Sequence, residues 1–69
     1  QLQRARDEAT SELALATRDR ERAERLINAG AAPEKRLDEA RTAETMARTR
    51  LTAAEATLAR YETARQGGA

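Results

Sequence analysis

The side chains able to do chemistry in this 69-residue sequence are carboxylates and guanidiniums, because it contains neither His nor Cys. The carboxylates at 7–8, 34, 38–39 and 55 are the candidates for acid–base work. A Ser–His or Cys–His pair cannot be assembled, and zinc or copper would lack its preferred ligands. A carboxyl group that catalyses proton transfer also needs a pocket that shifts its pKa and excludes water.

The composition predicts elements that offer no such pocket. Of the 27 apolar residues 17 are Ala, and the sequence has no Phe, Trp or Val. Strand-favouring residues other than Thr are nearly missing, whereas Ala, Glu, Arg and Leu together are typical of long packed helices. We therefore expect an all-α protein that is not an enzyme, with no catalytic, cofactor or metal site.

Gly30 and Pro33 predict where the helices break. Gly suits the left-handed residue after a helix end, and Pro suits a first helical turn. We expect a first helix over 1–29, a tip turn at 30–32 and a second helix over 33–66, followed by a Gly-rich exit segment at 67–69. A short connection makes the helices antiparallel, so the fold class is two long antiparallel helices forming a coiled-coil hairpin. The chain reads as a fragment of a larger protein.

The apolar spacing predicts the seam between the two arms. Glu44 interrupts the Leu positions of the second arm and Arg20 leaves a polar gap in the first. The first arm drifts toward a period of 3.6, which predicts little supercoiling. The predicted seam residues are Leu2, Ala5, Ala9, Leu13, Ala16, Ala23 and Ile27 in the first arm, and Leu37, Ala40, Ala47, Leu51, Ala54, Leu58 and Tyr61 in the second.

Arg22 and Leu26 stand four residues apart, hence on one helix face just before the turn. Ile27 continues the apolar stripe of the first arm, which leaves Leu26 at its edge, where it can meet a partner. In the alternative interpretation Leu26 caps the hairpin core and Arg22 is a solvated charge. A structural role is sufficient to explain Asp38, because a carboxylate near a helix N-terminus interacts favourably with the helix dipole.

The segment RAERLINAGAAPEKRLD, from Arg22 to Asp38, resembles the hairpin tip of periplasmic adaptor proteins (membrane fusion proteins) of tripartite efflux and type I secretion systems. In that family an Arg is followed after four residues by Leu, after seven more by Ser, and after five more by an acid. Arg22, Leu26 and Asp38 match, and Gly30 lies in the turn. Pro33 replaces the Ser and lacks its hydroxyl.

The resemblance implies a structural connector in transenvelope export. Its partner-binding tip would comprise Arg22, Leu26, Gly30 and Pro33 and would dock on a TolC-type outer-membrane channel. Regions outside this chain would reach an inner-membrane transporter and any membrane anchor. The implied location is the periplasm, and the implied assembly is a trimer or hexamer.

A second function is consistent with the same pattern: an antiparallel coiled-coil spacer or dimerisation arm of a larger ATPase or scaffold protein. Nucleic acid is not an expected partner, although the sequence has 12 Arg and one Lys. Acids interleave with these bases to leave a net charge of +1, so a nucleic acid would gain little from releasing counterions.

Overall fold

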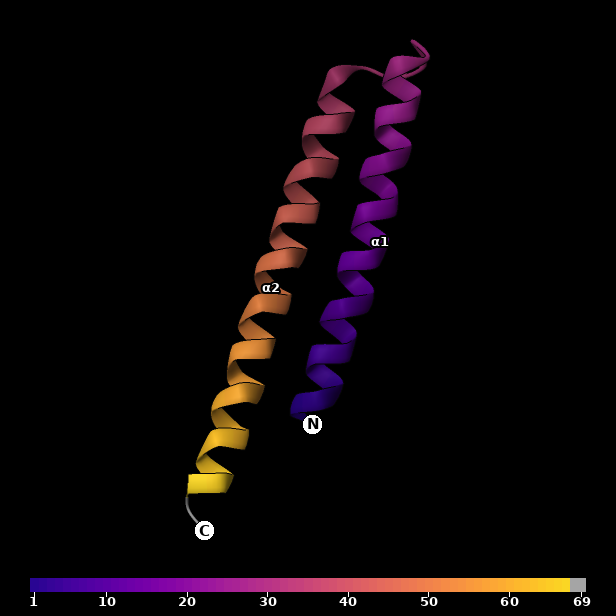
Figure 1. The fold of residues 1–69 in the computed structure, drawn as a ribbon. Coiled ribbons are helices and arrows are strands. Elements are labelled where there is room, and N and C mark those ends of the chain that lie inside the picture. The colour runs from indigo at the N-terminus through magenta and orange to yellow at the C-terminus, as the bar shows by residue number, and fades with distance from the viewer. Residues whose placement is uncertain (68–69) are drawn as a thin grey trace.

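The computed structural model describes residues 1–67, which form two antiparallel helices joined by one short turn (Figure 1). Helix α1 spans Leu2–Asn28 and helix α2 spans Glu34–Gly67, with no strand among the described residues. The molecule measures 59 × 14 × 13 Å, and its radius of gyration is 16.5 Å. A compact domain of this length would have a radius of gyration of about 11 Å. The predicted all-α helical hairpin is confirmed, and its shape is a rod.

The helix boundaries follow from the turn residues. Helix α1 ends at Asn28, and Pro33 directly precedes α2, so the first helical residue is Glu34. The Pro33 carbonyl accepts the Arg36 N–H at 3.0 Å, which makes Pro33 the capping residue of α2. Gly67 belongs to the last turn of α2 rather than to an exit segment, and the remaining two residues of that predicted segment lie outside the described residues. Neither helix is long and apolar enough to cross a membrane.

Alanines form the centre of the seam between the helices. The buried apolar residues of the described chain are Ala9 and Ala23 from α1 with Ala40 and Ala47 from α2. The leucines of the seam are only half-buried beside these alanines. Each layer of this seam consequently buries little apolar area, and the hydrophobic stabilisation per layer is small.

The seam prediction is wrong at two residues, Ala5 and Tyr61. Ala5 is exposed, and Arg6 takes its place in the seam as a half-buried residue. The aliphatic stem of an arginine can cover apolar surface while its guanidinium stays in water. Here the Arg6 Nε lies 2.8 Å from Asp7 Oδ1. With Arg6 included, the spacing of α1 alternates strictly between four and three residues, so the predicted drift toward 3.6 is also wrong. The 3.5-residue period is that of a left-handed coiled coil.

Tyr61 occupies its predicted heptad position without being packed there. It is 51% exposed, and the Arg65 guanidinium carbon lies 5.9 Å from its ring centre. Helix α1 begins at Leu2, which lines the same surface depression as Leu58 and Tyr61. Beyond that point α2 continues without a partner on α1, as the yellow end of Figure 1 shows. Tyr61 therefore lies at the open end of the seam and is only partly covered.

Candidate functional site

The tip turn has a defined and tightly bonded geometry. Gly30 has a φ of +71°, the left-handed conformation that favours glycine. The Gly30 N–H donates to the Ile27 carbonyl at 2.9 Å, and the Ala31 N–H donates to the Leu26 carbonyl at 2.7 Å. These two hydrogen bonds define a Schellman motif, which satisfies carbonyls that a helix end otherwise leaves without partners. The predicted role of Gly30 in ending the first helix is explained by this motif.

Arg22 and Leu26 lie on α1 just before this turn, and both are exposed. Leu26 is 37% exposed, whereas its neighbour Ile27 is half-buried in the seam. The structure thus places Leu26 at the edge of the apolar stripe and Ile27 within it, as the spacing predicts. Arg22 and Leu26 occupy one face of α1 one turn apart, so a guanidinium and an apolar side chain are presented together.

The other tip positions lie on the α2 side of the turn. Pro33 is exposed and offers its carbonyl to Arg36, and Asp38 is exposed in the second turn of α2. Gly30 and Pro33 lie in the turn between α1 and α2, so they share one end of the rod with Arg22 and Leu26. The four predicted tip residues share this end of the hairpin.

A polar layer crosses the middle of the seam. The sequence indicates this layer only as two separate gaps in the apolar repeats. The Arg20 Nε donates to Glu44 Oε1 at 3.1 Å, and its Nη2 donates to Glu44 Oε2 at 3.3 Å. The Thr17 hydroxyl donates to Glu44 Oε2 at 2.9 Å, and the third Arg20 nitrogen reaches Glu24 at 2.7 Å. Glu44 is only 8% exposed, yet both of its carboxylate oxygens have partners. A buried charge paired in this way avoids the penalty of an unpaired one.

The ionisation of this layer follows from its hydrogen bonds. The Arg20 guanidinium, followed by the Thr17 hydroxyl, lowers the pKa of Glu44 below its ordinary value. Glu44 and then Glu24 raise the pKa of Arg20 in turn. Arg20 and Glu44 are therefore both charged at neutral pH, and their pair is an ionic link between the helices.

A second ionic link joins the helices nearer the tip. The two terminal nitrogens of Arg36 lie 2.9 and 3.3 Å from the two carboxylate oxygens of Asp19. This bidentate geometry is the stronger form of an arginine–carboxylate pair. The Arg36 hydrogen bond is the main cause of a lowered pKa at Asp19, and the charge of Arg22 lowers it further. Sequence reasoning missed this pair, because neither residue belongs to the apolar repeat.

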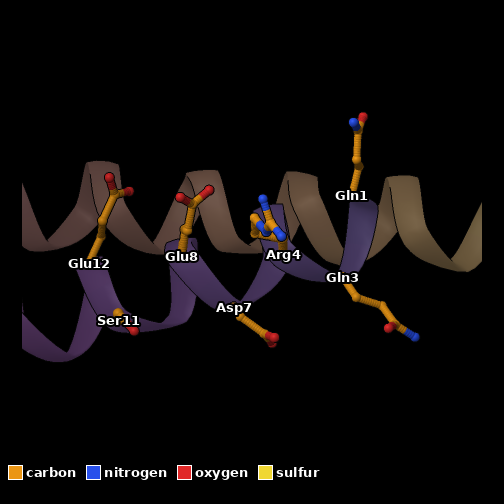
Figure 2. A pocket seen from close by; sticks show the side chains of 7 residues that line it. All are labelled: Gln1, Gln3, Arg4, Asp7, Glu8, Ser11 and Glu12. Carbon is orange, nitrogen blue, oxygen red and sulfur yellow. The ribbon is translucent and has the colours of Figure 1, made fainter.

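The carboxylates near the N-terminus are spread over two sides of α1. Figure 2 shows Glu8 and Glu12 pointing to one side of α1, while Asp7 and Ser11 point to the other. Asp7 and Glu8 are both exposed, so solvent has full access to them. The described residues contain no group of three or more acidic side chains placed to hold a metal ion.

Comparison of the chain with protein-family models, with curated proteins and with solved structures finds no match. The adaptor resemblance therefore depends on the sequence pattern alone. Any function must be argued from the exposed groups of the hairpin itself.

Proposed function

We propose that this chain is the connector hairpin of a periplasmic adaptor, whose tip docks on the helical mouth of a TolC-type outer-membrane channel. The observation that carries the proposal is the pairing of an exposed Arg22 with an exposed Leu26 immediately before the Gly30 turn. Both lie near the end of a rod 59 Å long, so the tip can contact a partner far from the base of the hairpin. Through regions outside the chain, the hairpin would link the channel to an inner-membrane transporter.

The chemistry of the tip fits a helical partner. A guanidinium presents a planar fork of donors to the carbonyl and carboxylate oxygens found at helix ends. Leu26 adds apolar area next to it, and interfaces concentrate their binding energy in a few such residues. Gly30 fixes how the turn presents these side chains. Pro33 supplies no hydroxyl, so in this proposal Arg22 and Leu26 provide the recognition.

The test compares tip variants with a matched variant far from the tip. Arg22→Asp and Leu26→Ser in the full-length protein should abolish export and cross-linking to the channel, with helicity retained in circular dichroism. Arg4→Asp changes an exposed arginine near the other end of α1 and should leave both readouts unchanged. Full export with both tip variants would refute the proposal.

A second candidate function, a coiled-coil dimerisation arm, is favoured by one specific observation. The outward-facing positions of α2 between residues 42 and 59 are all exposed and none is charged. We call this surface the outer face of α2; it comprises Thr42, Thr45, Met46, Thr49, Thr52, Ala53, Ala56 and Ala59. A solvated helix face normally carries charge. An uncharged face 18 residues long is what a helix needs in order to pack against another helix.

A further inference from the structure

We infer that two copies of this chain pair through the outer face of α2, with the two α2 helices antiparallel. The inference depends on the second candidate function, self-association, and adds the identity of the partner and the orientation of the pair. It needs nothing from the tip, since Arg22 and Leu26 lie on α1.

The two helices differ in what they present to solvent. The outward positions of α1 carry charges along most of the helix, and its uncharged outward residues between 4 and 25 are Ser11, Ala14 and Leu15. On α2 a single large side chain, Met46, stands among Thr and Ala, and it is 51% exposed. Small side chains allow two helix backbones to approach closely, and Met adapts its shape to the surface it meets. The face of α2 is therefore suited to another helix.

The charges beside this face identify a second copy as that helix. One flank carries Arg41 and Arg48 in its first half and Glu55 and Glu62 in its second half. Arg41 and Arg48 are each 59% exposed and make only long contacts within the chain, at 3.8 Å to Glu24 and 3.7 Å to Glu44. In an antiparallel pair this flank lies along the same flank of the other copy. Both arginines then face the glutamates of the partner, about a midpoint near Leu51.

A parallel pair would lose these contacts. The flank would instead lie along the opposite one, which carries Ala43, Arg50, Thr57 and Ala64 and offers no carboxylate. The antiparallel pair brings the two Arg50 side chains near its midpoint, where they can extend into water. The antiparallel pair thus gains four arginine–glutamate contacts and brings one pair of like charges, the two Arg50 side chains, close together. This balance favours the antiparallel orientation.

The same midpoint matches large residues with small ones. It places Met46 of each copy against Ala56 of the other, and Thr49 against Ala53. It also brings Arg60, at one end of the face, within a turn of Glu39 of the other copy. The surface is thus complementary to itself in shape and in charge, as a two-fold interface requires.

Cysteine cross-linking tests the orientation, and the chain has no Cys of its own. Chains carrying Met46→Cys and chains carrying Ala56→Cys should form a disulfide with each other when mixed, and neither should do so alone. Two positions ten residues apart on a helix are separated by about 15 Å, too far for a disulfide. Disulfides formed by each variant alone would show a parallel pair and overturn the orientation while leaving the dimerisation function in place.

Sedimentation equilibrium tests the surface. Ala53→Glu should weaken self-association of the chain by about tenfold or more, because it buries an unpaired carboxylate. Ala14→Glu, the same change at an exposed outward alanine of α1, should have no effect, and circular dichroism should show equal helicity for both. A chain monomeric at every concentration, or equal effects of the two variants, would overturn the inference. Arg22→Asp should leave the dimer intact, so a failure of channel binding remains distinguishable.

Discussion

Replacing Gly30 with alanine isolates the contribution of the tip turn to stability. A Cβ added to Gly30 would meet no atom within 4 Å, so side-chain clashes contribute nothing. What remains is the cost of the backbone, because φ is +71° and an L residue in this conformation loses about 1–2 kcal/mol. Alanine also restricts the unfolded chain, which recovers about 0.4–1 kcal/mol. The expected net loss is therefore about 1 kcal/mol, or a fall of about 4–8 °C in Tm for a chain of this size.

Two matched substitutions make the result decisive. D-alanine at residue 30 adopts a positive φ without strain, so it should raise Tm by retaining only the effect on the unfolded chain. Gly67 is helical and likewise has open space for an added methyl group, so Gly67→Ala should be neutral or stabilising by less than about 1 kcal/mol. Thermal unfolding followed by circular dichroism, through the loss of the helix signal, measures all three.

A different pattern of Tm changes would contradict the left-handed conformation of residue 30. L-alanine at residue 30 that melts with the wild type would mean that the turn in solution does not use a left-handed residue there. Equal losses from L- and D-alanine would mean that the added methyl group, rather than backbone conformation, determines the cost. Either result would also remove the fixed geometry that the tip needs in order to present Arg22 and Leu26.

Three further predictions concern the seam and the cap. Arg20 lowers the pKa of Glu44, so the ionised Glu44 stabilises the folded state fully above the ordinary Glu pKa of about 4.3. This stability is lost as pH falls through the lower folded-state pKa. When Tm is measured as pH is lowered, Glu44→Gln should show a smaller drop than the wild type. Leu51→Ala should cost about 1–2 kcal/mol in urea unfolding because Leu51 is half-buried, while Leu15→Ala, at a 67% exposed position, should cost almost nothing. Pro33→Ser should leave Tm unchanged or higher, since a serine hydroxyl caps α2 for about 1 kcal/mol, and a clear fall in Tm would contradict the capping geometry.

The sequence predicts the hairpin well because its strongest signals are local. Gly30 and Pro33 determine the conformation of the backbone at their own positions. The Ala-rich repeats on either side favour helices over any other packed structure. The error at Ala5 has a physical cause: an alanine contributes so little apolar area that Arg6, with its longer stem, covers the seam equally well. Tyr61 is less buried than its heptad position predicts, because its burial depends on where α1 begins, which the heptad pattern does not contain.

The ionic links needed the alignment of the two arms, which no local signal provides. Arg20 and Glu44 each interrupt an apolar repeat, and only the geometry of the turn determines that the two gaps meet. Asp19 and Arg36 belong to no repeat at all. For the tip, sequence spacing places Arg22 and Leu26 correctly on the exposed side of α1 near the turn, whereas what they bind remains a proposal.

The polar layer explains how a seam made mostly of alanine selects one alignment of the two helices. Alanine layers resemble each other, so a shift of one helix by a heptad would change the apolar packing only slightly. The same shift would place Arg20 and Glu44 against apolar seam positions, Leu51 and Ile27 for a shift in one direction, and would leave both charges without partners, which costs far more than the apolar contacts involved. A single buried polar pair thus specifies register, as polar core residues do in other coiled coils. Since the Gly30 turn fixes the alignment at one end and this layer fixes it in the middle, the tip residues are held in a defined position at the end of the rod.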